Sequence, residues 1–379
     1  MTIPVLNPVS QTYWLIALLA IVLCYRLRHK QEPLKLSTHV TSELKGFAIL
    51  AVIFAHICFY LSQDSRFLNP VALSAGVGVD LFLFLSGYGL THSMIHKDLG
   101  VLAFYKRRLI RIFVPLWTVL IMLFGLDFLI LDRTYSPLTI LESFLGFFPR
   151  ADLYESLNAP FWYLTLILFY YLIYPILFSK KAPFITSLLI GATGLIVSRL
   201  TLPVNMYTLV SYKVHVLAFP LGVTIASLVY SQTPRIKKIV HAISAAVNRP
   251  GMATFSVRLI IISVLIALFA YTTIHARIGE GVWLQQLTGL FTMLTVVAIF
   301  VLKPIEIPFL SLIGMYSYEI YLIHWPLLYR YDVLYRFLPA SLATFLYLFV
   351  FLAIGYALQK LSNKILDPSK TKQAPPSLS

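Results

Sequence analysis

The sequence predicts an all-α membrane protein, a bundle of about eleven transmembrane helices. Hydrophobic residues make up 59% of the 379 positions. Charged residues make up only 12%, about half of the share in a soluble globular protein. The apolar residues gather in runs that are long enough, or nearly so, to cross the hydrocarbon core of a bilayer. The loops between these runs alternate between rich and poor in Lys and Arg, as in a polytopic protein.

Eleven apolar runs are expected to form the spans, and in chain order they are residues 9–25, 45–62, 75–94, 111–131, 160–178, 184–202, 214–230, 257–275, 282–302, 308–329 and 339–359. Of the 30 Lys and Arg residues, 22 fall in one set of alternating connections and 8 in the other. The positive-inside rule places the richer set in the cytoplasm. We therefore expect the N-terminus outside and the C-terminus in the cytoplasm. The net charge of +15 follows from this topology and does not indicate a nucleic-acid partner.

The second run organises the rest of the chain. Lys45 stands at its start, and His56 is the only side chain within it that ionises near neutral pH. Eleven residues separate the two, which is close to three full turns, so both lie on one helix face about 16 Å apart along the axis. A polar ring inside hydrocarbon is costly, and His56 is therefore a candidate functional residue.

Two further ionisable residues are predicted at the same depth as His56. Asp80 in the third span and His324 in the tenth lie, like His56, about 7–10 Å below the outer surface. The three groups are expected to share one polar cavity, the alternative being three separately satisfied residues. Asp80 is expected to bind one ring nitrogen of His56 and raise the basicity of the other. The alternative is that Asp80 pairs with an arginine or a glycine-rich turn. His215 is expected at the membrane interface.

Three more motifs suggest binding surfaces. Arg108 and Arg111, three residues apart, share a helix face at the cytoplasmic start of the fourth span, where two guanidinium groups suit a phosphate-bearing ligand. By charge pattern alone, the simpler interpretation is contact with anionic lipid. Trp162 and Tyr163 open the fifth span as an aromatic belt or as a surface for sugars. Glu319 is five residues from His324 and does not share its face. No metal-ligand spacing is present.

These motifs together resemble the acyltransferase-3 family of integral-membrane acyltransferases. The matching segments, in order, are Glu43-Leu-Lys-Gly46 followed by His56, Gly78-Val-Asp-Leu-Phe-Leu-Phe-Leu-Ser-Gly-Tyr88, Tyr105-Lys-Arg-Arg-Leu-Ile-Arg-Ile-Phe-Val-Pro115, Phe161-Trp-Tyr-Leu164, and Ser317-Tyr-Glu-Ile-Tyr-Leu-Ile-His-Trp-Pro326. The resemblance covers about residues 40–360. It implies a ten-helix core in residues 40–362, an added N-terminal helix and linker in 1–39, and a disordered cytoplasmic tail in 363–379.

The resemblance also implies an activity. Members transfer an acyl group, typically acetyl from acetyl-CoA, to a hydroxyl of a cell-surface glycan or its lipid-linked precursor, with no metal. The resemblance implies that Lys45 and His56 are the essential pair, that Arg108 and Arg111 meet the acyl donor, and that Asp80 stands in the Gly-Val-Asp motif. We expect His56 and Asp80 to be catalytic, and Lys45, Arg108 and Arg111 to bind the donor. Many relatives carry glutamates after the tryptophan motif, and this chain has none there.

The expected acceptor site contains Trp162, Tyr163, His324 and Glu319. The expected location is the inner membrane of a bacterium, with the bilayer, acyl-CoA and a glycan as partners, and a homo-oligomer is left open. The main alternative is a proton-coupled transporter or glycan flippase, because buried His and Asp residues also suit a proton pathway. The absence of an internal repeat argues against a carrier.

Overall fold

The computed structural model describes residues 2–30, 36–97, 100–230, 252–275 and 281–366, and isolated positions between 233 and 245. In chain order the elements are α1 (Pro8–Cys24), β1 (Arg28–His29), α2 (Thr38–His56), η1 (Ile57–Leu61), α3 (Asn69–Ala72), α4 (Ala75–His96), α5 (Val101–Leu131), α6 (Pro137–Phe144), η2 (Ala159–Phe161), α7 (Trp162–Leu177), α8 (Pro183–Val197), α9 (Met206–His215), α10 (Ala218–Val229), α12 (Met252–His275), α13 (Val282–Leu302), β2 (Ile305–Glu306), α14 (Pro308–Met315), α15 (Ser317–Tyr329) and α16 (Ala340–Leu366).

The structure confirms the predicted all-α polytopic bundle. In the described part of the chain, eight helical segments are long and apolar enough to cross a membrane. The shorter apolar helices α1 and α8 occupy the predicted spans 9–25 and 184–202. The predicted span 308–329 is divided between α14 and α15, because the helix breaks at Tyr316. Each predicted run therefore corresponds to helical structure.

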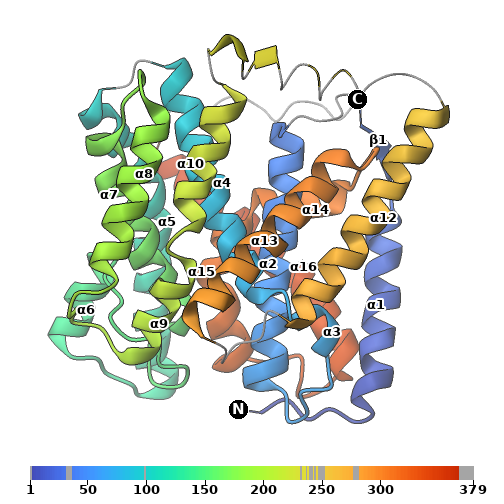
Figure 1. Ribbon diagram of the computed structural model, residues 1–379. Coiled ribbons are helices and arrows are strands. Elements are labelled where there is room, and N and C mark those ends of the chain that lie inside the picture. Colours follow the sequence, from blue (N-terminus) through green and yellow to red (C-terminus); the bar gives the residue numbers. More distant parts are fainter. Residues whose placement is uncertain are drawn as a thin grey trace.

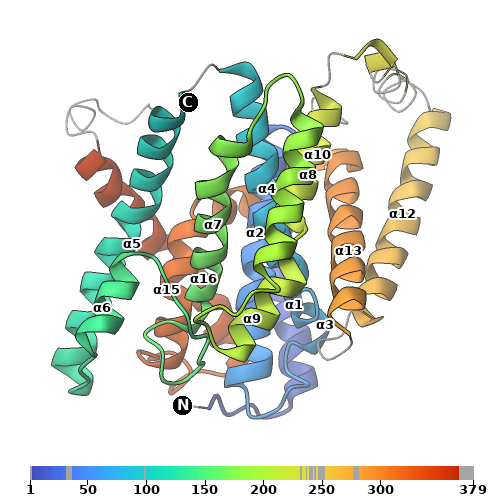
Figure 2. The same cartoon turned by 60° about the vertical axis from the view of Figure 1, so that its left-hand side comes forward.

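Helix α2 lies at the centre of the bundle and α12 at its edge, as both views show (Figure 1 and Figure 2). Of the eight long segments, the one containing α2 is the most deeply buried. Its N-terminus is fixed by Ser37, whose side chain accepts a hydrogen bond from the Val40 amide. Helix α14 crosses α2 where Gly314 faces the Ser42 carbonyl and Gly46 faces the Leu310 carbonyl. Small residues allow this approach of two backbones.

A polar cluster ties both the N-terminal segment and α2 to the end of α13 and the connection that follows it. β1 pairs antiparallel with β2, and Lys30, just after β1, donates to the Val301 carbonyl at 2.7 Å. Glu43 is fully buried, and its carboxylate receives hydrogen bonds from Lys303 at 2.9 Å and from the Ile307 amide. Glu43, which opens the family motif, therefore has a structural role, because it ties α2 to the connection between α13 and α14.

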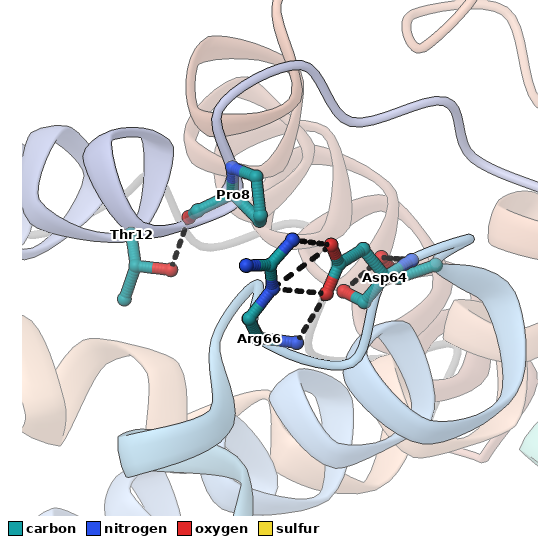
Figure 3. Close-up of polar contacts among 5 residues, drawn as sticks. Pro8, Thr12, Asp64 and Arg66 are labelled. Carbon is teal, nitrogen blue, oxygen red and sulfur yellow. Dashed lines mark hydrogen bonds and ion pairs between the residues drawn. The ribbon is translucent and has the colours of Figure 1, made fainter.

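At the other end of the bundle, α1 is held against the loop that follows η1. Thr12 donates to the Pro8 carbonyl and accepts from the Leu68 amide, at 2.8 and 2.9 Å. Figure 3 shows Pro8 and Thr12 beside Arg66, whose guanidinium binds the Asp64 carboxylate. Hydrogen bonds from Arg66 lower the pKa of Asp64 to about 2. The added N-terminal helix is thus an integral part of the bundle.

The first residues of the predicted tail, 363–366, are helical. Helix α16 continues to Leu366, four residues beyond the predicted core boundary at 362. The remainder of the predicted tail, residues 367–379, lies outside the described residues.

Candidate active site

His56 is the last residue of α2 and lies at a change in helical geometry. The five residues after it form the wider turn η1, closed by a hydrogen bond from the Ser62 amide to the Ile57 carbonyl at 2.8 Å. Such π-helical turns occur often at functional sites. The His56 ring is half-buried and faces α15, where His324 and Trp325 are fully buried. One uninterrupted helix thus carries both Lys45 and His56, as the sequence predicts.

His56 and His324 form a hydrogen-bonded pair. The Nδ1 atom of His56 is 2.9 Å from the Nε2 atom of His324, and the two rings are nearly parallel. His324 Nδ1 faces the carbonyls of Tyr321 at 2.9 Å and Ile320 at 3.2 Å. A carbonyl only accepts hydrogen bonds, so this nitrogen carries the proton.

The positions of the remaining protons follow from this arrangement. In a neutral His324 ring, Nε2 is unprotonated and accepts a hydrogen bond from His56 Nδ1–H. The Nε2 atom of His56 then holds a free lone pair, and no group in the described part of the chain is hydrogen-bonded to it. His324 therefore fixes the tautomer in which His56 can accept a proton.

The predicted pairing of Asp80 with His56 is wrong. Asp80 Oδ1 accepts a hydrogen bond from His215 Nδ1 at 2.7 Å, and both residues are buried. His215 is therefore not the interfacial residue that the sequence suggested. Depth along a helix follows from the sequence, but the direction of a side chain around the helix depends on which helices pack together. The common cavity of three groups is replaced by two pairs, His56–His324 and Asp80–His215.

A row of aromatic rings connects the two pairs. Trp162 stacks on His215, with ring centroids 5.9 Å apart, and contacts Tyr163 at 6.4 Å. Tyr163 lies 5.7 Å from Tyr321, which lies 6.2 Å from His324. Trp162 and Tyr163 keep some accessible surface, whereas Tyr321 is buried. The predicted pair Trp162 and Tyr163 therefore lies between the two histidine pairs and can offer flat apolar faces to a ligand.

The structure adds residues to this site that the sequence analysis missed. Tyr60 and Trp325 contact the His56 ring at centroid distances of 6.0 and 5.2 Å. Tyr60 is four residues from His56, a spacing that places two side chains on one helix face, so this neighbour was predictable. Glu319 lies elsewhere, against Gly355 of α16 and near Gln359 of the same helix, whose amide donates to the Met315 carbonyl. The structure therefore does not bring Glu319 to the histidine pair.

The predicted donor residues lie together at the other end of α2. Arg108 is half-buried, and Arg111 and Lys45 are exposed. Arg108 lies close enough to Lys45 for their charges to repel. The two arginines share a pocket of about 140 Å³ with Lys97 and Arg107, and Arg111 also lines a wider, adjoining one.

We call this region the basic end and define it by Lys97, Lys106, Arg107, Arg108, Arg111, Lys360 and Lys364. No acidic side chain in the described ranges forms an ion pair with these seven cations. Repulsion among unpaired cations is relieved when a polyanion binds. The basic end is therefore a potential anion-binding surface.

The fold and these residues define a polytopic membrane protein with a hydrogen-bonded histidine pair near one end and a basic surface at the other. Among the described residues, no group of three or more His, Cys, Asp or Glu could hold a metal ion. The family model Acyl_transf_3, described as an acyltransferase domain, matches residues 44–360. The chain belongs to this family, which makes it an integral-membrane acyltransferase. No curated protein and no solved structure matches it.

Proposed function

We propose that this protein transfers an acyl group, with acetyl as the expected group, from cytoplasmic acyl-CoA to a hydroxyl of a surface polysaccharide or its lipid-linked precursor. We place it in the inner membrane of a bacterium. The observation that supports this most strongly is the His56–His324 pair, because it leaves a basic nitrogen free at one end of a helix whose other end carries Lys45.

The donor binds from the basic end. Coenzyme A carries several phosphate groups, and Arg108 and Arg111 offer two guanidinium forks that no carboxylate occupies in the described residues. The extended pantetheine arm, roughly 15–20 Å long, is comparable with the rise of ~16 Å between Lys45 and His56. The thioester of a donor bound in this way reaches the level of His56.

His56 acts as the general base. Its Nε2 atom takes the proton of the acceptor hydroxyl while the hydroxyl oxygen attacks the thioester carbonyl carbon. The carbon–sulfur bond then breaks, and the coenzyme A sulfur takes the proton from His56. His324 accepts the hydrogen bond of His56 Nδ1–H throughout and stabilises the transient positive charge on the His56 ring.

Replacement of His56 tests the proposal. We expect His56→Ala to lower acyl transfer by about 10²–10⁴-fold, which is the usual contribution of a general base. The measurement is the acetyl content of surface glycans by mass spectrometry, with thermal unfolding of the purified protein to confirm folding. His39→Ala, an exposed histidine on the same helix, is the matched control. Unchanged glycan acetylation in folded His56→Ala would refute the role of this residue.

Charge reversal separates the donor site from the acceptor site. We expect Arg108→Glu to weaken binding of acetyl-CoA at least tenfold, because an attractive contact to phosphate becomes repulsive. Binding is measured by calorimetry on protein in nanodiscs, and Arg150→Glu, an exposed arginine outside the basic end, is the control. Equal weakening in both variants would show that net charge, and not this site, determines donor binding.

A further inference from the structure

A second cavity lies away from the basic end, on the side of α4 that carries Asp80. Its volume is about 900 Å³, and its walls come from η1, α3, α4, α9, α12 and α13. The His56 ring does not line it, but Tyr60, which contacts that ring, does. We call this cavity the lateral cleft.

Polar groups that can bind a ligand converge on the lateral cleft. Asp80 and His215 line it, and their mutual hydrogen bond uses only Oδ1 and Nδ1. In a neutral His215 ring, Nδ1 donates to Asp80 and Nε2 can accept a hydrogen bond from a ligand. The Thr273 hydroxyl is buried and has no hydrogen-bond partner in the described residues. A buried hydroxyl without a partner costs free energy, which a bound ligand can recover.

Gly289 keeps the Asp80 carboxylate accessible. A side chain at this position of α13 would place its Cβ 3.0 Å from Asp80 Oδ2. The glycine thus leaves open the space in front of the oxygen that His215 does not occupy. Gln285, one turn earlier on the same helix, also lines the cleft and adds an amide group.

The rest of the lateral cleft is apolar. Its wall includes Phe59, Leu73, Val77, Phe269 and Ile274. Phe269 and Ile274 belong to α12. In the apolar stretch of this helix, only 6% of the residues are buried within the protein. A helix this exposed and apolar faces lipid on its outer side. The cleft is therefore separated from the bilayer by one helix, α12. Polar groups line one part of the cleft, and apolar side chains line the rest.

We propose that the lateral cleft is the acceptor site and that the acceptor is an amphiphile, a hydroxyl-bearing head group joined to a hydrocarbon chain. This inference rests on the proposed function and selects the lipid-linked form of the acceptor over a free polysaccharide. The head group binds Asp80, His215 and Thr273, and the chain lies against the apolar wall. Tyr60 lies between the head group and His56. The reacting hydroxyl therefore passes the Tyr60 ring to reach the His56 ring.

A photoreactive probe tests the site directly. The probe is an alkyl glycoside with a diazirine in its chain, bound to protein in nanodiscs, irradiated and mapped by peptide mass spectrometry. We expect labels on the wall formed by Phe269 and Ile274, competition by octyl glucoside and no competition by methyl glucoside. Labelling spread evenly over the lipid-facing helices, or equal competition by both glucosides, would overturn the proposal.

Two variants of the cleft sharpen the test. Gly289→Leu fills the space before Asp80 and is expected to lower labelling at least fivefold. Ala298→Leu adds the same side chain to α13 outside the cleft, as a control. Thr273→Val keeps the side-chain volume but removes the hydroxyl, and is expected to weaken competition by octyl glucoside about 3–10-fold. Unchanged competition in Thr273→Val and unchanged labelling in Gly289→Leu would contradict the assignment.

Donor binding distinguishes failure of this inference from failure of the proposed function. Gly289→Leu is expected to bind acetyl-CoA as tightly as the wild type, because the basic end lies elsewhere. If the wild type does not bind acetyl-CoA, the proposed function fails, whereas the labelling pattern still decides whether the cleft takes an amphiphile. If acetyl-CoA binds and the cleft is not labelled, only the acceptor site is wrong.

Discussion

At the scale of single residues, the protonation of His56 depends on its neighbour. Two backbone carbonyls of α15 hold the proton on Nδ1 of His324, which leaves Nε2 of that ring to accept from His56. In many enzymes a carboxylate holds the catalytic imidazole in its tautomer. Here a second imidazole, itself oriented by a helix backbone, takes that position. The arrangement avoids placing a negative charge beside His56 inside the membrane.

This arrangement predicts different results for two substitutions of His324. Gln offers a carbonyl oxygen that can accept from His56 Nδ1–H, whereas Leu leaves that donor unpaired and the His56 ring free to turn. We expect His324→Leu to lower kcat about 10²-fold and His324→Gln to lower it less, by about tenfold. Steady-state acetyl transfer at saturating acetyl-CoA measures both. If the two variants lose the same activity, the hydrogen bond to His56 is not the role of His324.

The sequence predicts the depth of the site residues but not all of their partners. His56 and His324 were expected at one level of the membrane, and they form a hydrogen bond. Asp80 was expected at that level too, yet it points toward α9 and binds His215. Counting residues along a helix fixes height, whereas the partner depends on how α4 is rotated against α2, α9 and α13. That rotation is decided by packing across the whole bundle.

At the scale of elements, α2 links the two ends of the proposed reaction path. It can hold Lys45 and His56 at a fixed separation only if its own position is fixed. The crossing with α14 provides this, because Gly46 and Gly314 let the backbones touch. The buried ion pair between Glu43 of α2 and Lys303, the residue that follows α13, holds the same region of α2. Small residues and one ion pair thus set the position of the helix that carries Lys45 and His56.

The close crossing of α2 and α14 predicts that a single methyl group added at Gly314 lowers the stability of the protein. A Cβ at Gly314 would overlap the Ser42 carbonyl, so Gly314→Ala must move α14 away from α2. We expect a loss of about 1–3 kcal/mol in stability, the usual cost of overpacking. Gly125→Ala in α5 meets nothing within 4 Å and should be neutral or stabilising. Thermal unfolding in detergent compares the two, and equal melting temperatures would contradict the tight crossing.

At the scale of the whole molecule, the sequence predicts the number and order of the membrane segments well. Long apolar runs leave few alternatives to a membrane helix, since every backbone polar group must be satisfied within the segment. The divided span at 308–329 was not predicted, because the one glycine near the break at Tyr316, Gly314, is of a residue type that is also frequent inside membrane helices. The lateral cleft was not predicted either. It forms from residues of six elements that only the packed bundle brings together.

Lys30, which lies outside the basic end, determines in part how stability responds to pH. Lys30 is buried against the last carbonyls of α13, and burial, together with the nearby charge of Lys303, lowers its pKa to about 8. The pKa of an unfolded lysine is about 10.4. Below pH 8 both states carry the proton, and the cost of burying the charge is present in full. Above pH 8 the folded state releases the proton before the unfolded state does, so stability rises with pH up to about 10.4.

The predicted rise of stability with pH can be tested by comparison with a variant that lacks the titrating group of Lys30. We expect the thermal unfolding midpoint of the wild type to rise, relative to that of Lys30→Met, as the pH increases from 7 to about 9.5. The difference between the two proteins isolates Lys30, because all other titrating groups are present in both. A constant difference over this range would show that Lys30 keeps an ordinary pKa. In that case the N-terminal segment would be held at α13 by a lysine that remains in contact with water.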